Sequence, residues 1–375
     1  MSPVGANIIN EEEWLVGMEL GTFSCLPMAM KAAIELDVLQ IIANAGQGLQ
    51  ISPTQIVAQI PKVTNPDAAI TLDRILRVLA SHSLLSCSVT TDKNGKPERL
   101  YGLTPLCKYL VHNKDGLSLA PLVLMNQDKV FIDTWFYLKD AVLEGSQPFT
   151  KAHGVNAFEY PAQDQRFNRV FNKAMAEHST IVMGRILETY QGFKDLEELV
   201  DVGGGVGSTL NLIVSKYPHI KGVNFDMPHV VADAPVYPGV THVGGDMFNS
   251  VPSGKAIFMK WILHDWSDDH CLRLLKNCHK ALPENGKVIA VDSILPVAAE
   301  TSAYARQAFH VDLCMLAYNP GGKERTEDNF KDLAKAAGFA GESFKSECLP
   351  PCGPSVNNLP ASLWASLSLV SSGVR

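Results

Sequence analysis

The sequence has no surplus of positive charge and no long apolar segment. Its 375 residues include 32 Lys and Arg against 39 Asp and Glu, a formal net charge of −7. That balance argues against a general binder of nucleic acid or of anionic membranes. No apolar run is long enough to span a membrane, and the acidic start of the chain does not have the pattern of a signal or transit peptide. We therefore expect a cytoplasmic protein that binds neither nucleic acid nor membrane.

The eight cysteines include no Cys-x-x-Cys pair, so the commonest zinc and dithiol patterns are absent. Cys271 and Cys278 lie with His270 and His279 on one expected helix, Asp268 to Leu282. A zinc site needs its ligands on one face of that helix, and this spacing allows it only in part. A core helix is the stronger interpretation. We expect reduced thiols and no metal.

What the chain does contain is a glycine-rich turn between a predicted strand and a predicted helix. The apolar run Leu199–Val202 indicates a buried parallel strand, Gly203–Gly207 follows, and Ser208 begins a helical period. Such a turn lets the backbone approach a ligand, and the helix start offers free N–H groups. Ser208 stands where the dinucleotide fingerprint has its third glycine. An acid, Asp201, precedes the glycines without that fingerprint, which favours a ligand with a cationic amino-acid portion, S-adenosylmethionine (SAM). A tight turn without any ligand is the alternative for this motif alone.

Acidic residues end several of the strands that follow. The predicted strand Lys221–Asp226 ends in an acid about 25 residues after the first strand, close to the offset at which βαβ folds place a carboxylate on ribose hydroxyls. Asp246 follows the next strand, and Met247 beside it suits an adenine ring. A helix N-cap is the alternative for each acid alone. Several acids at the carboxyl ends of strands favour a ligand site, because open α/β sheets bind ligands at that edge.

The remaining elements predict two domains, residues 1–115 and 116–375. The N-terminal part has helical apolar patterns over Gly21–Ala45 and after two Xaa-Pro helix starts. A hairpin signal around Asn94-Gly95 follows them. Together they indicate a winged-helix-like N-terminal domain. Because few basic residues surround its candidate recognition helix, a buried dimerisation module is favoured over DNA binding. A helical connector then leads from residue 116 to an α/β, doubly wound and mostly parallel, Rossmann-like sheet. The further strands are expected at Val240–Val243, Ala256–Trp261 and Gly286–Asp292.

With these elements in view, the chain resembles the plant phenolic O-methyltransferases, closest to the caffeic acid 3-O-methyltransferase group. The resemblance extends from Glu11 to about Gly341. It is carried by the motifs Leu124–Lys129, Ala157–Tyr160, Val200–Gly205, Phe225–His229, Gly244–Phe248, Met259–Trp261, His264–Trp266 and Asn319–Thr326.

The resemblance implies SAM as methyl donor, no metal, and a homodimer joined through the N-terminal domain. It implies that the donor contacts Gly203, Asp226, Asp246, Met247 and Lys260.

The resemblance also implies that His264 is the catalytic base, flanked by Asp292 and Glu324. Chemistry agrees, because transfer to a phenol requires a phenolate, and two carboxylates can orient an imidazole and stabilise the imidazolium that forms. A structural or capping histidine is the alternative on the residue pattern alone. The residues implied for a flat phenolic ring are Met125, Asn126, Phe167, Phe171, Met315 and Asn319.

Four residues depart from the group's usual pattern. Asp292 stands where a glutamate is usual, Pro161 where a histidine is found, and Cys314 and Tyr318 where an aliphatic residue and a histidine are common. The sequence therefore predicts the aromatic ring of the acceptor more firmly than the side chain attached to that ring. The tail after residue 341 is also atypical: its prolines cannot donate ladder hydrogen bonds, so we do not expect the family's closing antiparallel strands.

The favoured function is methyl transfer from SAM to a caffeic acid-like phenol, with a hydroxycoumarin, furanocoumarin or flavonoid as the alternative acceptor. A nicotinamide-dependent dehydrogenase would share the sheet and the Asp226 position, but Ser208 and the absence of a Tyr-x-x-x-Lys pair near the sheet disfavour it. An inactive paralogue or a SAM-binding interaction protein is the non-enzymatic alternative.

Overall fold

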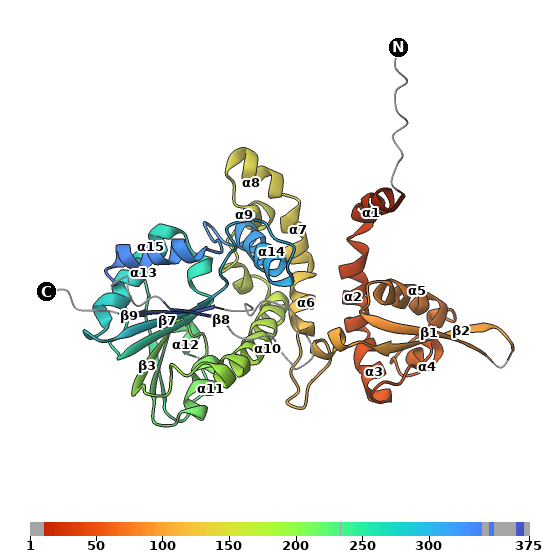
Figure 1. Ribbon diagram of the computed structural model, residues 1–375, viewed down its shortest axis with the longest axis horizontal. Coiled ribbons are helices and arrows are strands. Elements are labelled where there is room, and N and C mark those ends of the chain that lie inside the picture. Colours follow the sequence, from red (N-terminus) through yellow and green to blue (C-terminus); the bar gives the residue numbers. More distant parts are fainter. Residues whose placement is uncertain (1–10, 93, 233, 340–344, 349–364, 371–375) are drawn as a thin grey trace, which may run out of the picture. The chain divides into compact units, whose positions relative to one another are not determined.

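The computed structural model describes residues 11–92, 94–232, 234–339, 345–348 and 365–370 (Figure 1). They form two compact units: residues up to Lys129 with Arg169–His178, and Val130–Asn168 with the chain from Ser179. The long helix α10 (Gln165–Thr189) therefore contributes to both. The predicted domain boundary between residues 115 and 116 stays a prediction, because the helices after it are divided between the two units.

The first unit is a small helical fold with one β-hairpin. Its elements are α1 (Glu11–Thr22), α2 (Cys25–Glu35), α3 (Val38–Ala45), α4 (Pro53–Val57), α5 (Ala68–Ser81), β1 (Leu85–Thr91), β2 (Pro97–Leu103), the 3-10 helix η1 (Pro105–Tyr109) and α6 (Ala120–Asn126). The predicted hairpin is confirmed, with β1 and β2 antiparallel. Ser52 begins α4 with a capping box, as its Ser-Pro start predicts. The broad apolar pattern over Gly21–Ala45 is divided among three helices, and Asp37 in the left-handed region (φ +56°) separates the last two.

The second unit contains a seven-stranded sheet in the order β5-β4-β3-β6-β7-β9-β8. Five strands are parallel: β3 (Glu198–Val202), β4 (Lys221–Asp226), β5 (Val240–Gly244), β6 (Ala256–Lys260) and β7 (Lys287–Asp292). Each lies within a residue or two of its predicted span. The doubly wound, mostly parallel fold is thereby confirmed.

Helices cover both faces of this sheet (Figure 1). The end of α10 and α11 (Ser208–Lys216) pack on one face, and α13 (Asp268–Ala281) and α15 (Glu327–Ala337) on the other. Cys271 and Cys278 of α13 are fully buried in that second layer, so the core interpretation of this helix is confirmed. The other helices of the unit are α7 (Lys129–Trp135), α8 (Leu138–Glu144), α9 (Pro148–His153), η2 (Tyr160–Ala162), α12 (Pro228–Val231), η3 (Leu263–Asp265) and α14 (Ala303–Tyr318).

The expectation that closing antiparallel strands are missing was wrong. β9 (Ala365–Val370) pairs antiparallel with β7, and β8 (Lys345–Cys348) pairs antiparallel with β9. The sequence of β9, Ala-Ser-Leu-Ser-Leu-Val, alternates small polar with apolar residues, which suits a strand. The prolines that argued against a strand lie at 350, 351, 354 and 360, outside the described residues.

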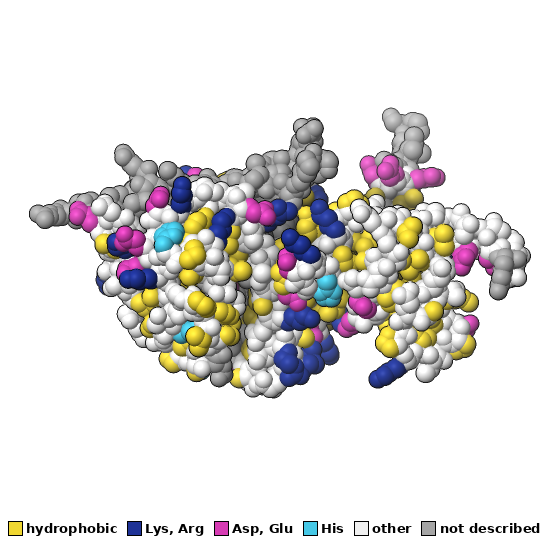
Figure 2. Space-filling model, turned by 90° about the horizontal axis from the view of Figure 1, so that it is seen from below, with side chains coloured by type: hydrophobic (Ala, Val, Ile, Leu, Met, Phe, Trp, Pro, Cys, Tyr) yellow, Lys and Arg dark blue, Asp and Glu magenta, His cyan; other side chains and the backbone are white. Residues whose placement is uncertain are grey.

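Among the described residues, no helix combines the length and apolarity needed to cross a membrane. On the face drawn in Figure 2, acidic and basic side chains are interspersed with hydrophobic ones.

Candidate active site

The glycine-rich turn after β3 has a backbone that only glycine accommodates easily. Gly203, Gly205 and Gly207 have φ values of +71°, +59° and +84°. A Cβ on Gly203 would lie 2.4 Å from Cδ1 of Ile262, and one on Gly204 would lie 2.1 Å from Oδ1 of Asn224. Gly203 and Gly204 are therefore packed closely against the protein, whereas a Cβ on Gly205 would meet nothing within 4 Å. The backbone at Gly205 is thus open at the carboxyl end of the sheet, where ligands of α/β folds bind.

Two acids beside this turn are fixed by backbone donors. Asp226 accepts hydrogen bonds from the N–H groups of Gly205 (2.8 Å) and Met227 (2.7 Å). Asp246 accepts one from the N–H of Phe248 (2.8 Å). The helix-cap interpretation does not hold for Asp226, because the N-cap of α12 is Met227, which makes no side-chain cap hydrogen bond. An ionised carboxylate has about four acceptor positions, and the backbone hydrogen bonds use only some of them, so both acids can still bind a ligand.

Lys260 ends β6 on the same edge. Its Nζ lies 4.1 Å from the centroid of the Trp261 ring, a cation–π distance. Burial lowers the pKa of Lys260 to about 8, against the opposing charges of Asp201, Asp292 and Asp265. Trp261 has a left-handed backbone (φ +57°), a conformation uncommon outside glycine and often found at functional sites.

His264 lies in η3, immediately after β6, and is 4% exposed. Its Nδ1 is 2.7 Å from Oε1 of Glu324, so Nδ1 carries the hydrogen and Nε2 keeps a lone pair in the neutral ring. Burial lowers the pKa of His264, but the nearby carboxylates of Asp265, Glu324 and Asp292 outweigh it and raise the pKa to about 9. The site therefore strongly stabilises an imidazolium.

Asp292 and Glu324 are placed differently around this ring. Glu324 makes the hydrogen bond to His264, and its own backbone N–H donates to Asp312 (2.9 Å). Asp292 is fully buried, and neither of its oxygens has a hydrogen-bond partner among the described residues. Burial raises the pKa of Asp292 to about 7, although the His264 charge opposes this. Asp292 thus acts on His264 through its charge, whereas Glu324 also orients the ring.

Sequence reasoning missed Asp265 and Arg325 as members of this site. Asp265 Oδ1 lies 3.6 Å from Nε2 of His264 and accepts a hydrogen bond from Nδ2 of Asn319 (2.6 Å). Arg325 is fully buried and donates to the carbonyls of Leu263 (2.6 Å) and Trp266 (2.8 Å), which holds the η3 loop. The available signals were the position of Asp265 next to His264 and of Arg325 next to Glu324.

The residues expected to contact a phenolic ring are divided between the two units. Met125 and Asn126 end α6 in the first unit, to which Phe171 also belongs. Phe167, Met315 and Asn319 belong to the second. Within the second unit, Asn319 Nδ2 lies near the sulfur of Met315 (3.5 Å) as well as Asp265, so these two side chains share the surroundings of His264.

An aromatic cluster surrounds Tyr318 in the second unit. Phe131 stacks on Tyr318 with ring centroids 3.9 Å apart, and it meets Phe167 edge to face at 5.2 Å. Trp135 meets Tyr318 edge to face, with ring centroids 5.6 Å apart. Tyr318 is buried, and burial raises the pKa of its neighbour Cys314 to about 11, so this surface is uncharged. Pro161 lies in η2, next to Tyr160, whose ring meets Phe167.

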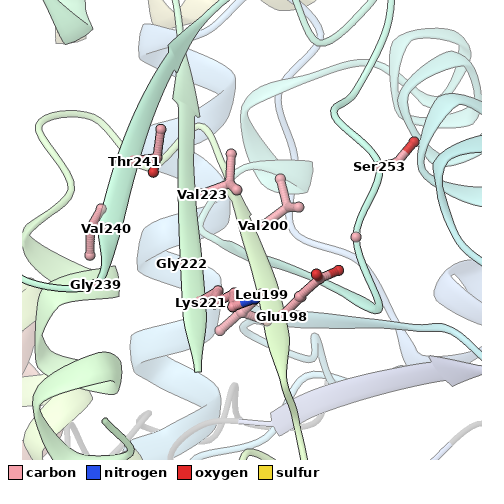
Figure 3. A pocket seen from close by; sticks show the side chains of 11 residues that line it. Glu198, Leu199, Val200, Lys221, Gly222, Val223, Gly239, Val240, Thr241 and Ser253 are labelled. Atoms are coloured by element: carbon pink, nitrogen blue, oxygen red, sulfur yellow. The ribbon is translucent and has the colours of Figure 1, made fainter. Parts of the chain in front are cut away.

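A separate cavity of about 460 Å³ is lined by residues that include Glu198, Lys221 and Val240 (Figure 3). These residues begin β3, β4 and β5. The cavity therefore lies toward the amino ends of the strands, at the edge opposite the glycine-rich turn, and does not belong to the site of His264. Among the residues the structure describes, no group of three or more His, Cys, Asp or Glu side chains could hold a metal ion.

Comparison with known proteins assigns this arrangement to the SAM-dependent O-methyltransferases. Residues 135–340 match the model of the O-methyltransferase domain, and residues 18–113 match the O-methyltransferase dimerisation domain. The chain belongs to the O-methyltransferase family, which confirms the resemblance found in its motifs.

Similar proteins support the same assignment. The chain is 60% identical over 342 residues to caffeic acid 3-O-methyltransferase of Medicago sativa, covering 91% of this chain and 93% of that one. It is 62% identical over 334 residues to the Prunus dulcis enzyme of the same name, covering 89% and 91%. Human N-acetylserotonin methyltransferase in complex with SAM shares the fold, with a TM-score of 0.76 at 20% identity over 99% of this chain and 100% of that one. The calicheamicin methyltransferase CalO1, bound to SAH, gives the same TM-score at 23% identity, covering 98% and 100%.

Proposed function

We propose that the protein transfers the methyl group of SAM to a phenolic hydroxyl of a caffeic acid-like phenylpropanoid, with His264 as general base. The observation that carries this proposal is the buried His264–Glu324 hydrogen bond at the carboxyl edge of the sheet. The high identity to caffeic acid 3-O-methyltransferases supports the acceptor class.

His264 removes the acceptor proton through Nε2. A phenol has an ordinary pKa of about 10 and a free imidazole one of about 6.5, so an isolated histidine is a modest base for this proton. The carboxylates of Asp265, Glu324 and Asp292 raise the pKa of His264. The pKa of the base is therefore closer to that of the phenol. The cost is that less of the imidazole is unprotonated at neutral pH, and a bound cation nearby would offset part of that cost.

Five residues are proposed to hold the donor: Gly203, Asp226, Asp246, Met247 and Lys260. The glycine-rich turn fits this role, because its backbone is open at Gly205, where a Cβ would meet nothing within 4 Å. Asp226 suits the ribose hydroxyls and Asp246 the adenine amino group, since both carboxylates keep free acceptor positions. The donor supplies an electrophilic methyl group on a sulfonium, and the chain supplies its position.

For the acceptor, Met125, Asn126, Phe167, Phe171, Met315 and Asn319 are proposed to contact the aromatic ring through sulfur, phenyl and amide groups. The cluster around Tyr318 favours a second candidate, a hydroxycoumarin, furanocoumarin or flavonoid. The uncharged aromatic cluster of Tyr318, Phe131 and Trp135 offers nothing to pair with a carboxylate, and an acceptor that reaches it would be a neutral ring.

We also propose a homodimer joined through the N-terminal domain. The domain matches the family's dimerisation model, and α1 exposes Trp14, Leu15, Met18 and Leu20, each more than half exposed, which is unusual for a face left in water. Sedimentation should give a dimer at micromolar concentration. A stable monomer, or salt-sensitive DNA binding, would contradict this proposal.

The function is tested by incubating the purified protein with methyl-labelled SAM and a panel of caffeate, catechol, hydroxycoumarin and flavonoid acceptors. Methylated product from at least one phenol is expected, and a chelator should leave the rate unchanged because His264, rather than a metal, supplies the base. No product from any phenol, while SAM still binds, would favour an inactive or donor-binding protein.

A further inference from the structure

Two buried oxygen atoms without hydrogen-bond partners lie beneath the glycine-rich turn. Asp201 of β3 and Asn224 of β4 are partners in the register of the parallel strands, and they are 2% and 0% exposed. Within the part of the chain that the structure describes, neither Oδ2 of Asp201 nor Oδ1 of Asn224 has a hydrogen-bond partner. A Cβ on Gly204 would lie 2.8 Å from the first oxygen and 2.1 Å from the second, so both oxygens face the same small space.

The orientation of the Asn224 amide is fixed by its other neighbours. Its Nδ2 donates to the carbonyl of Gly205 (2.8 Å) and lies 3.1 Å from Nδ1 of His242. Nε2 of His242 lies 2.9 Å from the carbonyl of Pro235, so Nε2 carries the hydrogen and Nδ1 accepts. Because both contacts require the NH2 group of Asn224, its Oδ1 must face Asp201.

Two unpaired acceptors in a dry space cost free energy, whereas one proton between them removes that cost. The charged groups around Asp201 do not prevent protonation. Burial raises the pKa of Asp201 to about 8; Lys260 at the end of β6 lowers it, and Asp226 at the end of β4 raises it.

We propose that Asp201 is a positioning residue that is protonated in the folded protein at neutral pH and donates a hydrogen bond to Oδ1 of Asn224. Asn224 then holds the carbonyl of Gly205, while Asp226 holds the N–H of the same residue (2.8 Å). The turn is therefore fixed from both sides of Gly205 before any ligand binds. A neutral Asp201 does not pair with the cationic amino-acid portion of a ligand, so this role replaces the one that the sequence pattern suggested for it. The inference rests on the proposed function only in taking this turn as the donor site.

The test compares the thermal stability of the wild type and Asp201→Asn between pH 5 and pH 9, without donor or acceptor. An asparagine keeps a donor for Asn224 and cannot ionise. In the wild type the unfolded chain loses the Asp201 proton near the ordinary pKa of about 3.9 while the folded chain retains it, so this residue's contribution to stability falls as pH rises toward about 8. The melting temperature of Asp201→Asn should therefore gain on the wild type with rising pH and the gap should level off above about pH 8.

A gap that stays constant across this pH range, or that shifts in favour of the wild type as pH rises, would overturn the proposal, because it would mean that Asp201 is already ionised in the folded protein. If Asp201→Asn does not fold, Asp201→Ser, which keeps a hydroxyl donor, serves the same comparison.

A second measurement concerns the donor site. Asp201→Leu removes both the charge and the hydrogen-bond donor, so it should bind SAH about tenfold more weakly than Asp201→Asn, by the loss of one buried hydrogen bond. Equal SAH affinity in the two variants would overturn the role in positioning the turn. Since neither measurement uses methyl transfer, failure of the proposed acceptor chemistry would leave both results interpretable.

Discussion

Acidic residues occupy two neighbouring regions of the sheet edge, and the two regions use them differently. Asp226 and Asp246, beside the glycine-rich turn, both accept hydrogen bonds from backbone N–H groups. Around His264, by contrast, the side chain of Asp292 and Oε2 of Glu324 have no hydrogen-bond partner in the residues that the structure describes. Asp226 and Asp246 hold the backbone in place and keep lone pairs that a ligand could use. Asp292 and Glu324 instead concentrate negative charge around the His264 imidazole.

The position of a carboxylate at a strand end therefore does not by itself determine its role. What separates the two regions is whether backbone donors reach the carboxylate. Where they do, removing the acid should disturb binding. Where no backbone donor reaches the carboxylate, removing the acid should change the protonation of His264. The following variants test this difference.

The largest effect is expected from His264→Ala. A positioned general base contributes roughly 10²–10⁴-fold in rate, so turnover should fall by that factor while SAM affinity changes little. The measurement is labelled-methyl transfer to a saturating phenol, with SAM affinity by calorimetry. His310→Ala, at an exposed histidine, is the matched control and should keep the wild-type rate. Nearly full turnover in His264→Ala would show that another group removes the proton.

Asp226→Ala is expected to act on binding. It removes a charged acceptor proposed for the ribose and also the partner of the Gly205 N–H, and a lost hydrogen bond to a charged group costs roughly 1.5–3 kcal/mol. Calorimetry should show SAM affinity about ten- to a hundredfold lower. Asp195→Ala, at an exposed acid, should bind normally. Unchanged affinity in Asp226→Ala would refute the ribose assignment.

Glu324→Gln should have the smallest effect on turnover, about tenfold, because glutamine keeps a hydrogen-bonding shape beside Nδ1 of His264 and removes only the charge. Single-turnover rates measure the loss, with Glu300→Gln at an exposed position as control. A loss as large as that of His264→Ala would mean that Glu324 does more than orient the His264 ring and stabilise its charged form.

Much of the fold could be predicted from the sequence because its signals are local. The strand Lys221–Asp226 was predicted to the residue, since it ends in an acid at the offset expected after the first strand of a βαβ unit. β9 was not predicted, because the prolines before it argue against a strand, although Leu367 and Leu369 alternate with serines. A short strand that adds to the edge of an existing sheet needs little signal of its own.

The site could be predicted only in part, because its chemistry depends on contacts distant in sequence. Family motifs indicated His264 and Glu324, but the hydrogen bond between them joins residues 60 positions apart. Burial lowers the pKa of His264, and the raised value depends on neighbouring charges such as that of Asp265, which no spacing rule indicated. The unpaired oxygens of Asp292 likewise follow from packing rather than from any motif.

The most direct test of the central claim, that His264 is the base and that surrounding acids set its pKa, is the pH dependence of kcat/KM in the wild type and Glu324→Gln. The base must be unprotonated, so the wild type should show an ascending limb above the ordinary histidine pKa of about 6.5, toward about 9. Removing the Glu324 charge removes one cause of the raised pKa, so the limb should move to lower pH in the variant. A limb at the same pH in both proteins would contradict the account.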